Sequence, residues 1–491
     1  MLQLLALQLV AGAYSPPDMG LDAWFLLEGD TWHQFQLAGP CPWDLDKPWP
    51  PLNEPDRTTH KGVEQGIHHS VSKDLITWED RGIVLTVGPI GAWDDGLIFT
   101  GNIAKHDGKY YLFYTGIPRE RRPDAPCLTP IGVAVSEDLV HWEKHPRNPV
   151  LTPDPKYYNP NGDWRDCNFY RDEAAGLWYA VVAASAATDD YVAQGPCIGL
   201  ARSRDLIAWE CLPPIAGSTR YDLGLENPFL FEREGVWYTG HSMYSRFFSE
   251  EWRAEHPDEV AEGGLYYFTA PTMTGPYTLR GGLGLQPDPP IYACQIIPWK
   301  DEWLLMHRGP DRWATALPKR IAFLDDGRME LRYWPGVEQA RKESLAQVDA
   351  EASLGATDAP VAVGAAPLDC FFEARITLDA GAKAELALGD TFRVGCDRDA
   401  GAIYAIDLAT STPRADRTAE ADLTEPVYLR LVAEGSVVEA YANDVLLFLV
   451  NRPEPATHEA TIAIVGSGTA DRVALDRLDA GNTRYQYGFN Y

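Results

Sequence analysis

The stretch Glu226-Asn227-Pro228-Phe229-Leu230-Phe231, followed closely by Gly235-Val236-Trp237-Tyr238, places a carboxylate at the start of an apolar strand that precedes an aromatic one. Turn-flanked runs of this kind predict neighbouring strands of an antiparallel sheet. A carboxyl seated among Phe and Trp side chains is expected to have a raised pKa, because burial disfavours its charged form. By itself Glu226 is more simply an exposed acid at a strand end, so its interpretation depends on the rest of the chain.

The second half of this stretch belongs to a signature in which a turn is followed by aromatic or apolar residues. The signature occurs at Gly29-Asp30-Thr31-Trp32-His33, Gly108-Lys109-Tyr110-Tyr111, Gly176-Leu177-Trp178-Tyr179, Gly235-Val236-Trp237-Tyr238 and Asp301-Glu302-Trp303-Leu304. Its leading aromatic residues are separated by 78, 68, 59 and 66 residues. A second signature, Ser-x-Asp-Leu-x-x-Trp, lies between them at residues 72–78, 136–142 and 203–209.

Two interleaved repeats with one shared period indicate a repeated sheet unit, because a single unit could not bury both of its faces. Five such units most simply close into a five-bladed β-propeller, which protects its sheet edges by radial repetition. We therefore predict an all-β fold in which the repeated Trp residues are core. The propeller is expected to span residues 1–335.

The pattern changes after residue 335. Residues 336–365 are rich in Ala and charged residues and predict a linker or short helix. Alternating strands are then expected at Phe371–Leu378, Val427–Val432, Val437–Tyr441 and Val445–Val450. Such alternation is typical of antiparallel strands with one wet face, so we predict a C-terminal β-sandwich over residues 366–491 with a structural role.

Composition limits the partners. The 491 residues carry a formal net charge of -29, which argues against nucleic acid or an anionic membrane and fits a neutral substrate. The eight cysteines have no C-x-x-C pair and no metal-ligand spacing, so free thiols, no metal and no organic cofactor are expected.

Free thiols predict a reducing, cytoplasmic location. Residues 1–13 are apolar like a secretory segment but lack Lys and Arg, so a secreted or periplasmic protein is the alternative. The oligomeric state stays open.

Seven segments in order carry a resemblance to a known family. They are Gly66-Ile67-His68-His69-Ser70-Val71-Ser72-Lys73-Asp74-Leu75-Ile76-Thr77-Trp78, Asp95-Gly96-Leu97-Ile98-Phe99-Thr100-Gly101-Asn102, Asn161-Gly162-Asp163-Trp164-Arg165-Asp166, Glu226-Asn227-Pro228, Tyr292-Ala293-Cys294-Gln295, Leu317-Pro318-Lys319-Arg320 with Asp326-Gly327-Arg328, and Gly435-Ser436-Val437-Val438-Glu439-Ala440-Tyr441-Ala442-Asn443. This series resembles glycoside hydrolase family 32, the β-fructofuranosidases of the invertase, inulinase and levanase types. The resemblance spans nearly the whole chain.

The chain also departs from that family. The N-terminal WMNDPNG segment is absent, and Asp22, ten residues before Trp32, is the nearest equivalent of its acid. Asp18 is the rival. Cys167 stands where the family has the Pro of Arg-Asp-Pro, and Asn227 replaces the Cys of Glu-Cys-Pro. These changes retain the three acids and leave the substrate in doubt.

The resemblance implies a retaining hydrolase that acts on terminal β-fructofuranosidic linkages of oligosaccharides. It assigns Asp22 as the nucleophile, Glu226 as the general acid/base, and Asp166 as the acid that holds sugar hydroxyls and stabilises the oxocarbenium-like transition state. Arg165 is expected to orient these acids, and Glu226 to hold their shared proton. Further candidates for lining the pocket are Trp24, Trp43, His69, Trp93, Asp95, Asn102, His241 and Tyr292.

Two other functions remain open from the sequence. An inverting arabinofuranosidase or xylosidase would use Asp22 as a general base for water. The ten-residue spacing between Asp22 and Trp32 resembles that of the related five-bladed families 43 and 62, which favours this alternative, whereas the Leu317-Pro318-Lys319-Arg320 segment and the sandwich domain disfavour it. A propeller that binds carbohydrate without catalysis belongs to another class, and retention of three acids argues against it.

Overall fold

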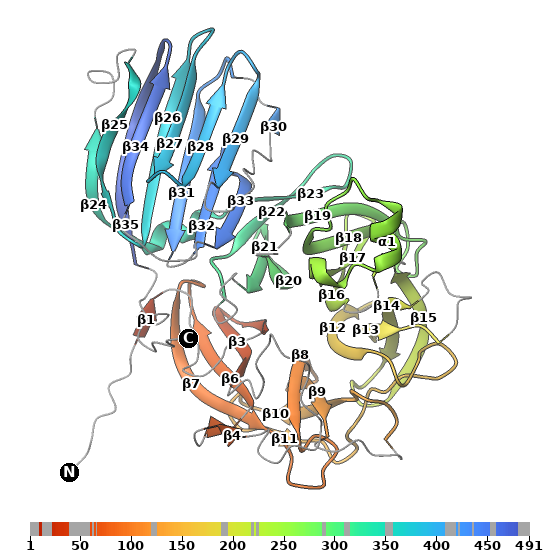
Figure 1. Cartoon of the computed structure of the whole chain (residues 1–491). Helices are drawn as coiled ribbons and strands as arrows, with labels where there is room; N and C mark the ends of the chain where they lie inside the picture. The colour runs from red at the N-terminus through yellow and green to blue at the C-terminus, as the bar shows by residue number, and fades with distance from the viewer. Residues whose placement is uncertain are drawn as a thin grey trace, which may run out of the picture.

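The computed structural model describes residues 9–11, 22–38, 59–60, 63–64, 66–118, 125–187, 195–217, 220–221, 225–286, 291–308, 315–348, 357–407, 419–420, 423–434, 437–451 and 458–479. Most of these residues lie in antiparallel strands, which form a propeller and a sandwich side by side (Figure 1). The prediction of an all-β fold with a propeller followed by a β-sandwich is confirmed.

Within the described residues, five sheets form the blades of the propeller. The first contains β2 (Ala23–Glu28), β3 (Thr31–Ala38), β6 (Gly66–Ser72) and β7 (Thr77–Thr86), with β1 (Leu9–Ala11) added beside β7. The second contains β8 (Leu97–His106), β9 (Lys109–Ile117), β10 (Ile131–Ser136) and β11 (Glu143–Lys144). The third contains β12 (Trp164–Asp172), β13 (Leu177–Ser185), β14 (Pro196–Ser203) and β15 (Trp209–Gly217).

The fourth sheet contains β16 (Glu226–Arg233), β17 (Val236–Met243), β18 (Gly263–Ala270) and β19 (Thr278–Gln286). The fifth contains β20 (Tyr292–Trp299), β21 (Glu302–Arg308), β22 (Lys319–Phe323) and β23 (Met329–Tyr333). A small hairpin of β4 (Thr59–His60) and β5 (Val63–Glu64), the turn η1 (Ser245–Phe247) and the helix α1 (Glu250–Glu255) complete this part. The first strand of each blade contacts its counterparts on both sides, and β20 contacts β2, so the ring closes around these five strands.

The Ser-x-Asp-Leu-x-x-Trp repeat is a turn between the third and fourth strands of a blade. The Ser203 hydroxyl oxygen accepts from the backbone N–H groups of Asp205 at 3.2 Å and Leu206 at 2.9 Å. The Asp205 carboxylate then accepts from the N–H groups of Ile207 and Ala208. Leu206 adopts a φ of 64° and is buried, so side-chain hydrogen bonds and packing together hold a backbone that leucine seldom adopts. The repeats at Ser72 and Ser136 have the same bonds.

The sandwich consists of two sheets over a shared apolar core. One sheet contains β24 (Arg341–Val348), β26 (Cys370–Leu378), β31 (Val427–Glu434), β32 (Val437–Ala442), β33 (Val445–Asn451) and β35 (Gly468–Leu478). The other contains β25 (Thr357–Ala366), β27 (Lys383–Leu388), β28 (Phe392–Asp397), β29 (Ala402–Asp407), β30 (Ala419–Glu420) and β34 (His458–Val465). The first of these sheets joins the fifth blade through the pair Arg332 and Val445.

The prediction of a linker at residues 336–365 is wrong for most of its length. Pro335–Ala340 form the turn η2, β24 pairs with β35, and β25 pairs with β34. Charged residues of β24 face outward at the sheet edge, while Leu345 and Ala346 pack on the sandwich core. An edge strand carries charge because its outer side is not paired, and that composition resembles a linker in the sequence.

A buried ion pair joins the propeller to the sandwich. Lys319, at the start of β22, has a side chain that is 0% exposed, and its Nζ lies 2.7 Å from Oε1 of Glu439, which is 4% exposed. The Lys319 Nζ also donates to the Leu317 carbonyl, and the Tyr441 hydroxyl donates to Glu439. Each charge is therefore paired and hydrogen-bonded, as burial requires.

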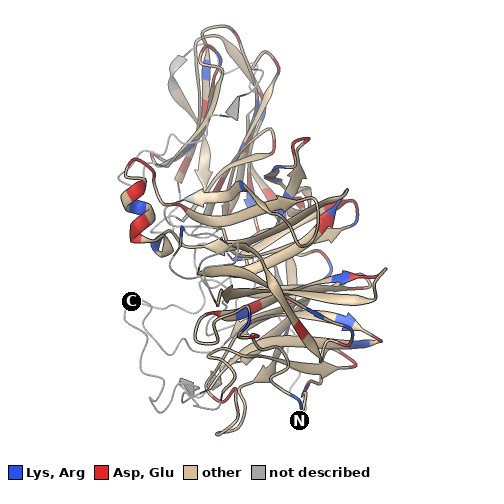
Figure 2. Cartoon of the chain, turned by 90° about the vertical axis from the view of Figure 1, so that its right-hand side faces the viewer, with Lys and Arg blue, Asp and Glu red and all other residues tan. Residues whose placement is uncertain are grey.

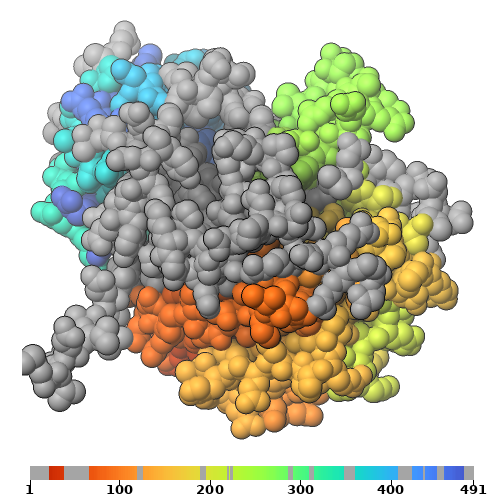
Figure 3. Space-filling model, turned by 60° about the horizontal axis from the view of Figure 1, so that its bottom comes forward, coloured from red at the N-terminus to blue at the C-terminus, as the bar shows by residue number. Residues whose placement is uncertain are grey.

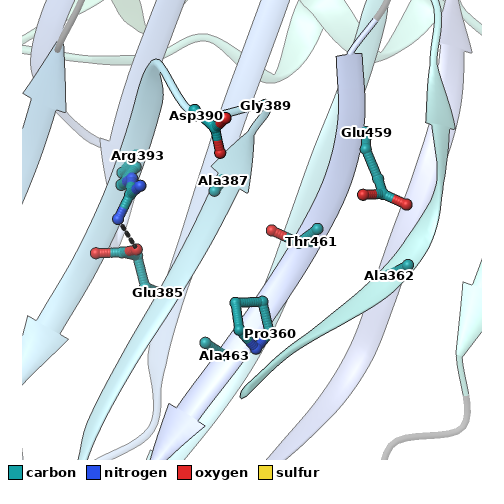
Figure 4. Close-up of a pocket in the computed structure, with 10 residues that line it drawn as sticks. All are labelled: Pro360, Ala362, Glu385, Ala387, Gly389, Asp390, Arg393, Glu459, Thr461 and Ala463. Carbon is teal, nitrogen blue, oxygen red and sulfur yellow. Dashed lines mark hydrogen bonds and ion pairs between the residues drawn. The ribbon is translucent and has the colours of Figure 1, made fainter. Parts of the chain in front are cut away.

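A groove of about 350 Å³ crosses the outer face of the second sandwich sheet (Figure 4). Its floor is made of small residues such as Ala387 and Thr461, and its charged residues include Glu385 and Arg393, which form an ion pair at 3.1 Å. The groove lies on a different domain from the three predicted catalytic acids. We assign it no role.

Acidic and basic residues are distributed over the described part of the chain. In Figure 2 the coloured Asp, Glu, Lys and Arg positions are interspersed along the ribbon. The seven cysteines in the described ranges form no disulfide. No helix in the described part is long and apolar enough to cross a membrane. Figure 3 shows the first three blades from below, in orange and yellow, with the sandwich in cyan and blue beyond them.

Candidate active site

The closed ring brings the three predicted acids to one end of its innermost strands. Asp22 directly precedes β2, Asp166 is the third residue of β12, and Glu226 is the first residue of β16. Because each of these strands lies at the axial edge of its blade, acids more than 50 residues apart in the sequence become neighbours. Side-chain contacts link all three of them.

Arg165 links two of the acids. Its Nη1 lies 2.6 Å from Oδ2 of Asp166, and its Nη2 lies 3.4 Å from Oε1 of Glu226. Its Nε lies 3.4 Å from Oδ1 of Asp163. A guanidinium presents several donors in one rigid plane, so Arg165 can hold the carboxyls of Asp166 and Glu226 at a set separation.

Asn227 links Asp166 to Asp22. Its side-chain Nδ2 donates to Oδ2 of Asp22 at 3.2 Å, and its backbone N–H donates to Oδ2 of Asp166 at 3.4 Å. Asn227 stands at the position where the resembled family has Cys. In this chain the residue at that position therefore supplies two hydrogen bonds to the carboxyl cluster.

Backbone irregularities aim these side chains. The pairing of β12 shifts after Arg165 and that of β16 shifts after Glu226. Within these shifts Asp166 has a φ of 56° and Asn227 a φ of 51°. Asp and Asn tolerate the left-handed region better than most residues, and such bulges turn side chains away from the regular sheet direction. The strand ends are thus bent toward the axis of the site.

Asp22 has partners from three other blades. Its Oδ2 accepts from the Thr100 hydroxyl at 2.6 Å and from Asn227, and its Oδ1 lies 3.4 Å from Nη1 of Arg308. Thr100 lies in β8 and Arg308 ends β21. The Asp22 side chain is 14% exposed, so it is held by its partners and keeps a small part of its surface accessible.

Glu226 receives a hydrogen bond from an aromatic pair. The Tyr292 hydroxyl donates to Oε2 of Glu226, and the rings of Tyr292 and Tyr244 stack with centroids 3.9 Å apart. Tyr292 begins β20, and Tyr244 follows β17. The prediction that Tyr292 belongs to the site agrees with this position, although its contact is with the acid.

Burial sets the protonation of the cluster. Burial raises the pKa of Asp166 to about 7, and the nearby charges of Glu226 and Asp22 add to this effect, while Arg165 opposes it. Burial also raises the pKa of Glu226, with a further contribution from Asp22 and opposition from Arg165 and Tyr292. Glu226 keeps 23% of its side chain exposed and Asp166 only 4%. Glu226 is therefore the acid better placed to exchange a proton with a bound molecule.

His69 and Trp24 lie in the core instead of lining a pocket. His69 is on the third strand of its blade, stacks on Phe35 with centroids 4.6 Å apart, and has a pKa lowered to about 3 by burial. Trp24 is 2% exposed and packs among apolar residues between the first two blades. The sequence predicts that both residues line a pocket, whereas both side chains are buried among apolar and aromatic neighbours within the blades.

Trp93, Asp95 and Asn102 belong to the second blade. Trp93 is half-buried over Gly116 and Gly132, where an added Cβ would meet its ring at 2.2 and 2.4 Å. Asp95 accepts from the Gly91 N–H at 2.7 Å and so holds the loop before β8. Asn102 is buried in β8, with its side chain bonded to the backbone of the next residue. No described contact joins these three residues to the acids.

His241 is buried in β17, and its pKa is lowered to about 4 by burial. Its Nδ1 bonds the Ser242 carbonyl at 3.3 Å, so it is a neutral core residue and not a pocket residue. Trp43 and the rival acid Asp18 lie outside the described residues.

Four residues of the cluster were missed from the sequence: Thr100, Asn227, Tyr244 and Arg308. Thr100 lies two residues before Asn102, and Asn227 directly follows Glu226. The position of each beside a candidate site residue is a signal that the sequence offers. Arg308 follows the last aromatic strand repeat by four residues. Its role depends on contacts with other blades, which no local pattern shows.

Among the residues that the structure describes, no group of three or more His, Cys, Asp and Glu side chains is arranged to hold a metal ion. The acids of the cluster are instead compensated by Arg165 and Arg308. Two guanidinium groups beside three acids leave a charge of zero when one acid is protonated. Such a cluster can offer a protonated and an ionised carboxyl together, as acid-catalysed glycoside cleavage needs.

A five-bladed propeller with three linked acids at the end of its inner strands is compatible with the chemistry of a glycosidase, which needs a protonated and an ionised carboxyl. Residues 53–254 match the model of the glycosyl hydrolases family 32 N-terminal domain. Over this segment, which is less than half of the chain, the sequence is similar to glycosyl hydrolase family 32.

Two curated relatives are similar to part of the chain. The chain is 30% identical over 168 residues to the sucrose-6-phosphate hydrolase of Bacillus subtilis, which covers 34% of this chain and 31% of that protein. It is 29% identical over 147 residues to the sucrose:sucrose 1-fructosyltransferase of Festuca arundinacea, which covers 30% of this chain and 21% of that protein. The similarity thus spans about a third or less of either relative.

A solved structure agrees over a greater length. The GH32 beta-fructofuranosidase of Bombyx mori superposes with a TM-score of 0.66 at 18% identity, covering 96% of this chain and 94% of that one. At this identity the agreement concerns the fold, which extends through both the propeller and the sandwich.

Proposed function

We propose that the protein is a glycoside hydrolase that cleaves terminal β-fructofuranosidic linkages of oligosaccharides with retention. The observation that carries the proposal is the linked cluster of Asp22, Asp166 and Glu226, joined by Arg165 and Asn227. Retaining glycosidases need one carboxyl that is ionised and attacks the sugar and a second that is protonated and donates to the leaving oxygen.

Glu226 is the general acid/base in this proposal. Burial raises its pKa, which favours the protonated form of the carboxyl. Tyr292 and Arg165 approach different oxygens of Glu226, Oε2 and Oε1, so the carboxyl plane is held by two donors. A held, partly exposed acid suits proton transfer to a leaving group and, in the second step, from water.

Asp22 is the nucleophile in this proposal. Its Oδ2 is occupied by the donors Thr100 and Asn227, whereas Oδ1 has Arg308 at 3.4 Å as its contact within the described part of the chain. We infer that Oδ1 is the attacking oxygen, since it has the weaker hydrogen bond. The partners of Oδ2 orient the carboxylate and stabilise its charge before the reaction.

Asp166 stabilises the transition state in this proposal. It is linked to Glu226 through Arg165, whose Nη1 lies 2.6 Å from it, and to Asp22 through Asn227. An ionised carboxylate at this position would stabilise the positive charge that develops on the sugar ring. The names of the two curated relatives support a fructosyl substrate, because one acts on sucrose 6-phosphate and the other on sucrose. The net charge of -29 favours a neutral oligosaccharide.

A product assay over sucrose, inulin, levan and aryl arabinofuranosides tests the substrate class. Release of fructose from one of the first three is expected, and activity on the arabinofuranosides alone would contradict the proposal. A trisaccharide formed from concentrated sucrose would show transfer to a sugar in place of water. Asp22→Asn, Asp166→Asn and Glu226→Gln should each reduce turnover by about 10²–10⁴-fold or more. Asp172→Asn, an acid at the opposite end of β12 from the cluster, is the matched control.

The stereochemistry of the product tests the role of Asp22. With methanol as acceptor, a methyl glycoside of unchanged anomeric configuration is expected, and azide should trap the intermediate of a slow Glu226→Ala variant on an activated aryl glycoside. The opposite anomer without methanolysis would make Asp22 a general base. An active Asp22→Asn variant together with an inactive Asp18→Asn variant would move the nucleophile to Asp18.

A further inference from the structure

Arg308 is a buried cation without a role in the chemistry described above. It ends β21 in the fifth blade, and its side chain is 8% exposed. Burying a guanidinium is costly unless several partners satisfy it. The groups that contact Arg308 therefore indicate its role.

One edge of the Arg308 guanidinium faces the proposed nucleophile. Nη1 lies 3.4 Å from Oδ1 of Asp22, the oxygen that we infer to attack the sugar. Arg165, the other cation of the cluster, bonds Asp166, Glu226 and Asp163. Among the described residues, Arg308 is thus the cation in ion-pair contact with Asp22.

The other edge and the face of the guanidinium meet the tyrosine pair. Nη2 of Arg308 donates to the Tyr244 hydroxyl, and the guanidinium carbon lies 4.9 Å from the ring centroid of Tyr292. The two tyrosine rings are stacked, and the Tyr292 hydroxyl donates to Glu226. A contact path therefore runs from Asp22 through Arg308 and the stacked rings to Glu226.

We propose that Arg308 is a positioning residue that holds the nucleophile Asp22 and, through the Tyr244–Tyr292 stack, the acid/base Glu226 in their working arrangement. This inference rests on the proposed function. The guanidinium acts on Asp22 by charge and on the tyrosines by hydrogen bonding and by its position over a ring. A lysine at this position would retain the charge but not the planar fork.

Tyr292 is suited to the intermediate position. Burial and the adjacent Glu226 raise its pKa well above the ordinary value, so its hydroxyl stays protonated and donates to the carboxyl at any working pH. Tilting of this ring would move the donor from Oε2 of Glu226. The stack on Tyr244 and the overlying Arg308 oppose such tilting.

The experiment compares Arg308→Gln, Arg308→Lys and Tyr244→Phe with the unaltered protein in pH profiles of kcat/KM on sucrose or an aryl β-fructofuranoside. Arg308→Gln should lower kcat by about 10²-fold with a small change in KM. It should also move the acid limb to higher pH, because a carboxylate that has lost its cation is harder to ionise. Arg308→Lys should keep the acid limb near its original position.

Tyr244→Phe isolates the second contact. It should leave the acid limb in place and move the alkaline limb, which reports the protonated acid. The proposal is overturned if Arg308→Gln or Tyr244→Phe folds, as judged by circular dichroism, and leaves both limbs and kcat unchanged. If Arg308→Gln fails to fold, unchanged limbs in Arg308→Lys and Tyr244→Phe overturn it equally. Failure of the proposed function appears separately, as activity in Asp22→Asn or absence of any fructosidase activity in the unaltered protein.

Discussion

The buried pair of Lys319 and Glu439 allows a quantitative prediction about how the two domains are joined. Lys319→Met removes the ammonium but fills similar space. It leaves Glu439, 4% exposed, with the Tyr441 hydroxyl as its remaining hydrogen-bond partner among the described residues. Breaking a buried ion pair in this way costs about 3–5 kcal/mol, because an uncompensated charge stays in the interior. We expect the free energy of unfolding to fall by that amount.

The double variant Lys319→Met, Glu439→Met distinguishes charge from packing. Replacing both partners by apolar residues of similar size is often close to neutral, so the double variant should be more stable than Lys319→Met alone. The control is Lys105→Met, which breaks the exposed pair with Glu28, at 2.6 Å and 42% and 34% exposed. That change should cost less than about 1 kcal/mol.

Urea unfolding followed by tryptophan fluorescence measures these differences, provided that a single transition is seen. A second transition in Lys319→Met would itself indicate that the propeller and the sandwich have been uncoupled. The reasoning is refuted if Lys319→Met costs no more than Lys105→Met. It is also refuted if the costs of the two single changes simply add in the double variant.

Three further predictions concern acid stability, backbone packing and ions. Burial lowers the pKa of His69 to about 3. The unfolded chain therefore binds a proton near pH 6.5 that the folded chain does not bind, so the free energy of unfolding falls as pH falls toward 3. His69→Gln should reduce the loss between pH 6.5 and 4 by up to about 3 kcal/mol, measured by urea unfolding at each pH. In Gly101→Ala the new Cβ would lie 1.9 Å from the Phe113 carbonyl oxygen, whereas at Gly29, with a φ of 62°, nothing lies within 4 Å. Gly101→Ala should lower the free energy of unfolding by about 3 kcal/mol or more, and Gly29→Ala by about 1–2 kcal/mol. Equal melting temperatures of the two variants would contradict this. Activity should survive prolonged dialysis against EDTA, and a loss restored by a divalent ion would contradict the expectation that no metal is needed.

The repeats are the part of the fold that the sequence showed most directly. Each Ser-x-Asp-Leu-x-x-Trp segment forms its turn with its own side chains, as at Ser203 and Asp205. Because these interactions are local, the same letters produce the same turn in three blades. The linker prediction failed for the complementary reason. Whether Leu345 and Ala346 face a core depends on β35, more than 120 residues away, and composition alone does not show that pairing.

The site divides in the same way. The sequence identified Asp166, Glu226 and Arg165 because they stand in recognisable motifs, and it named His69 and Trp24 because polar and aromatic residues near motifs resemble a sugar pocket. Those two side chains point into the blade interior, since a one-residue step along a strand reverses the face of the sheet. Motif membership does not specify that face.

The sequence by itself determined the units of this protein: strands that alternate, turns that hydrogen-bond internally, five repeats and three acids at strand starts. Only the tertiary structure decided which side chains meet. Thr100 and Arg308 contact Asp22, and Tyr244 stacks on Tyr292, the hydrogen-bond partner of Glu226. These residues come from separate blades. Their contacts exist because the ring closes, bringing strands 60 or more residues apart within hydrogen-bonding distance. Closure depends on packing between whole blades, and no short stretch of residues carries that information.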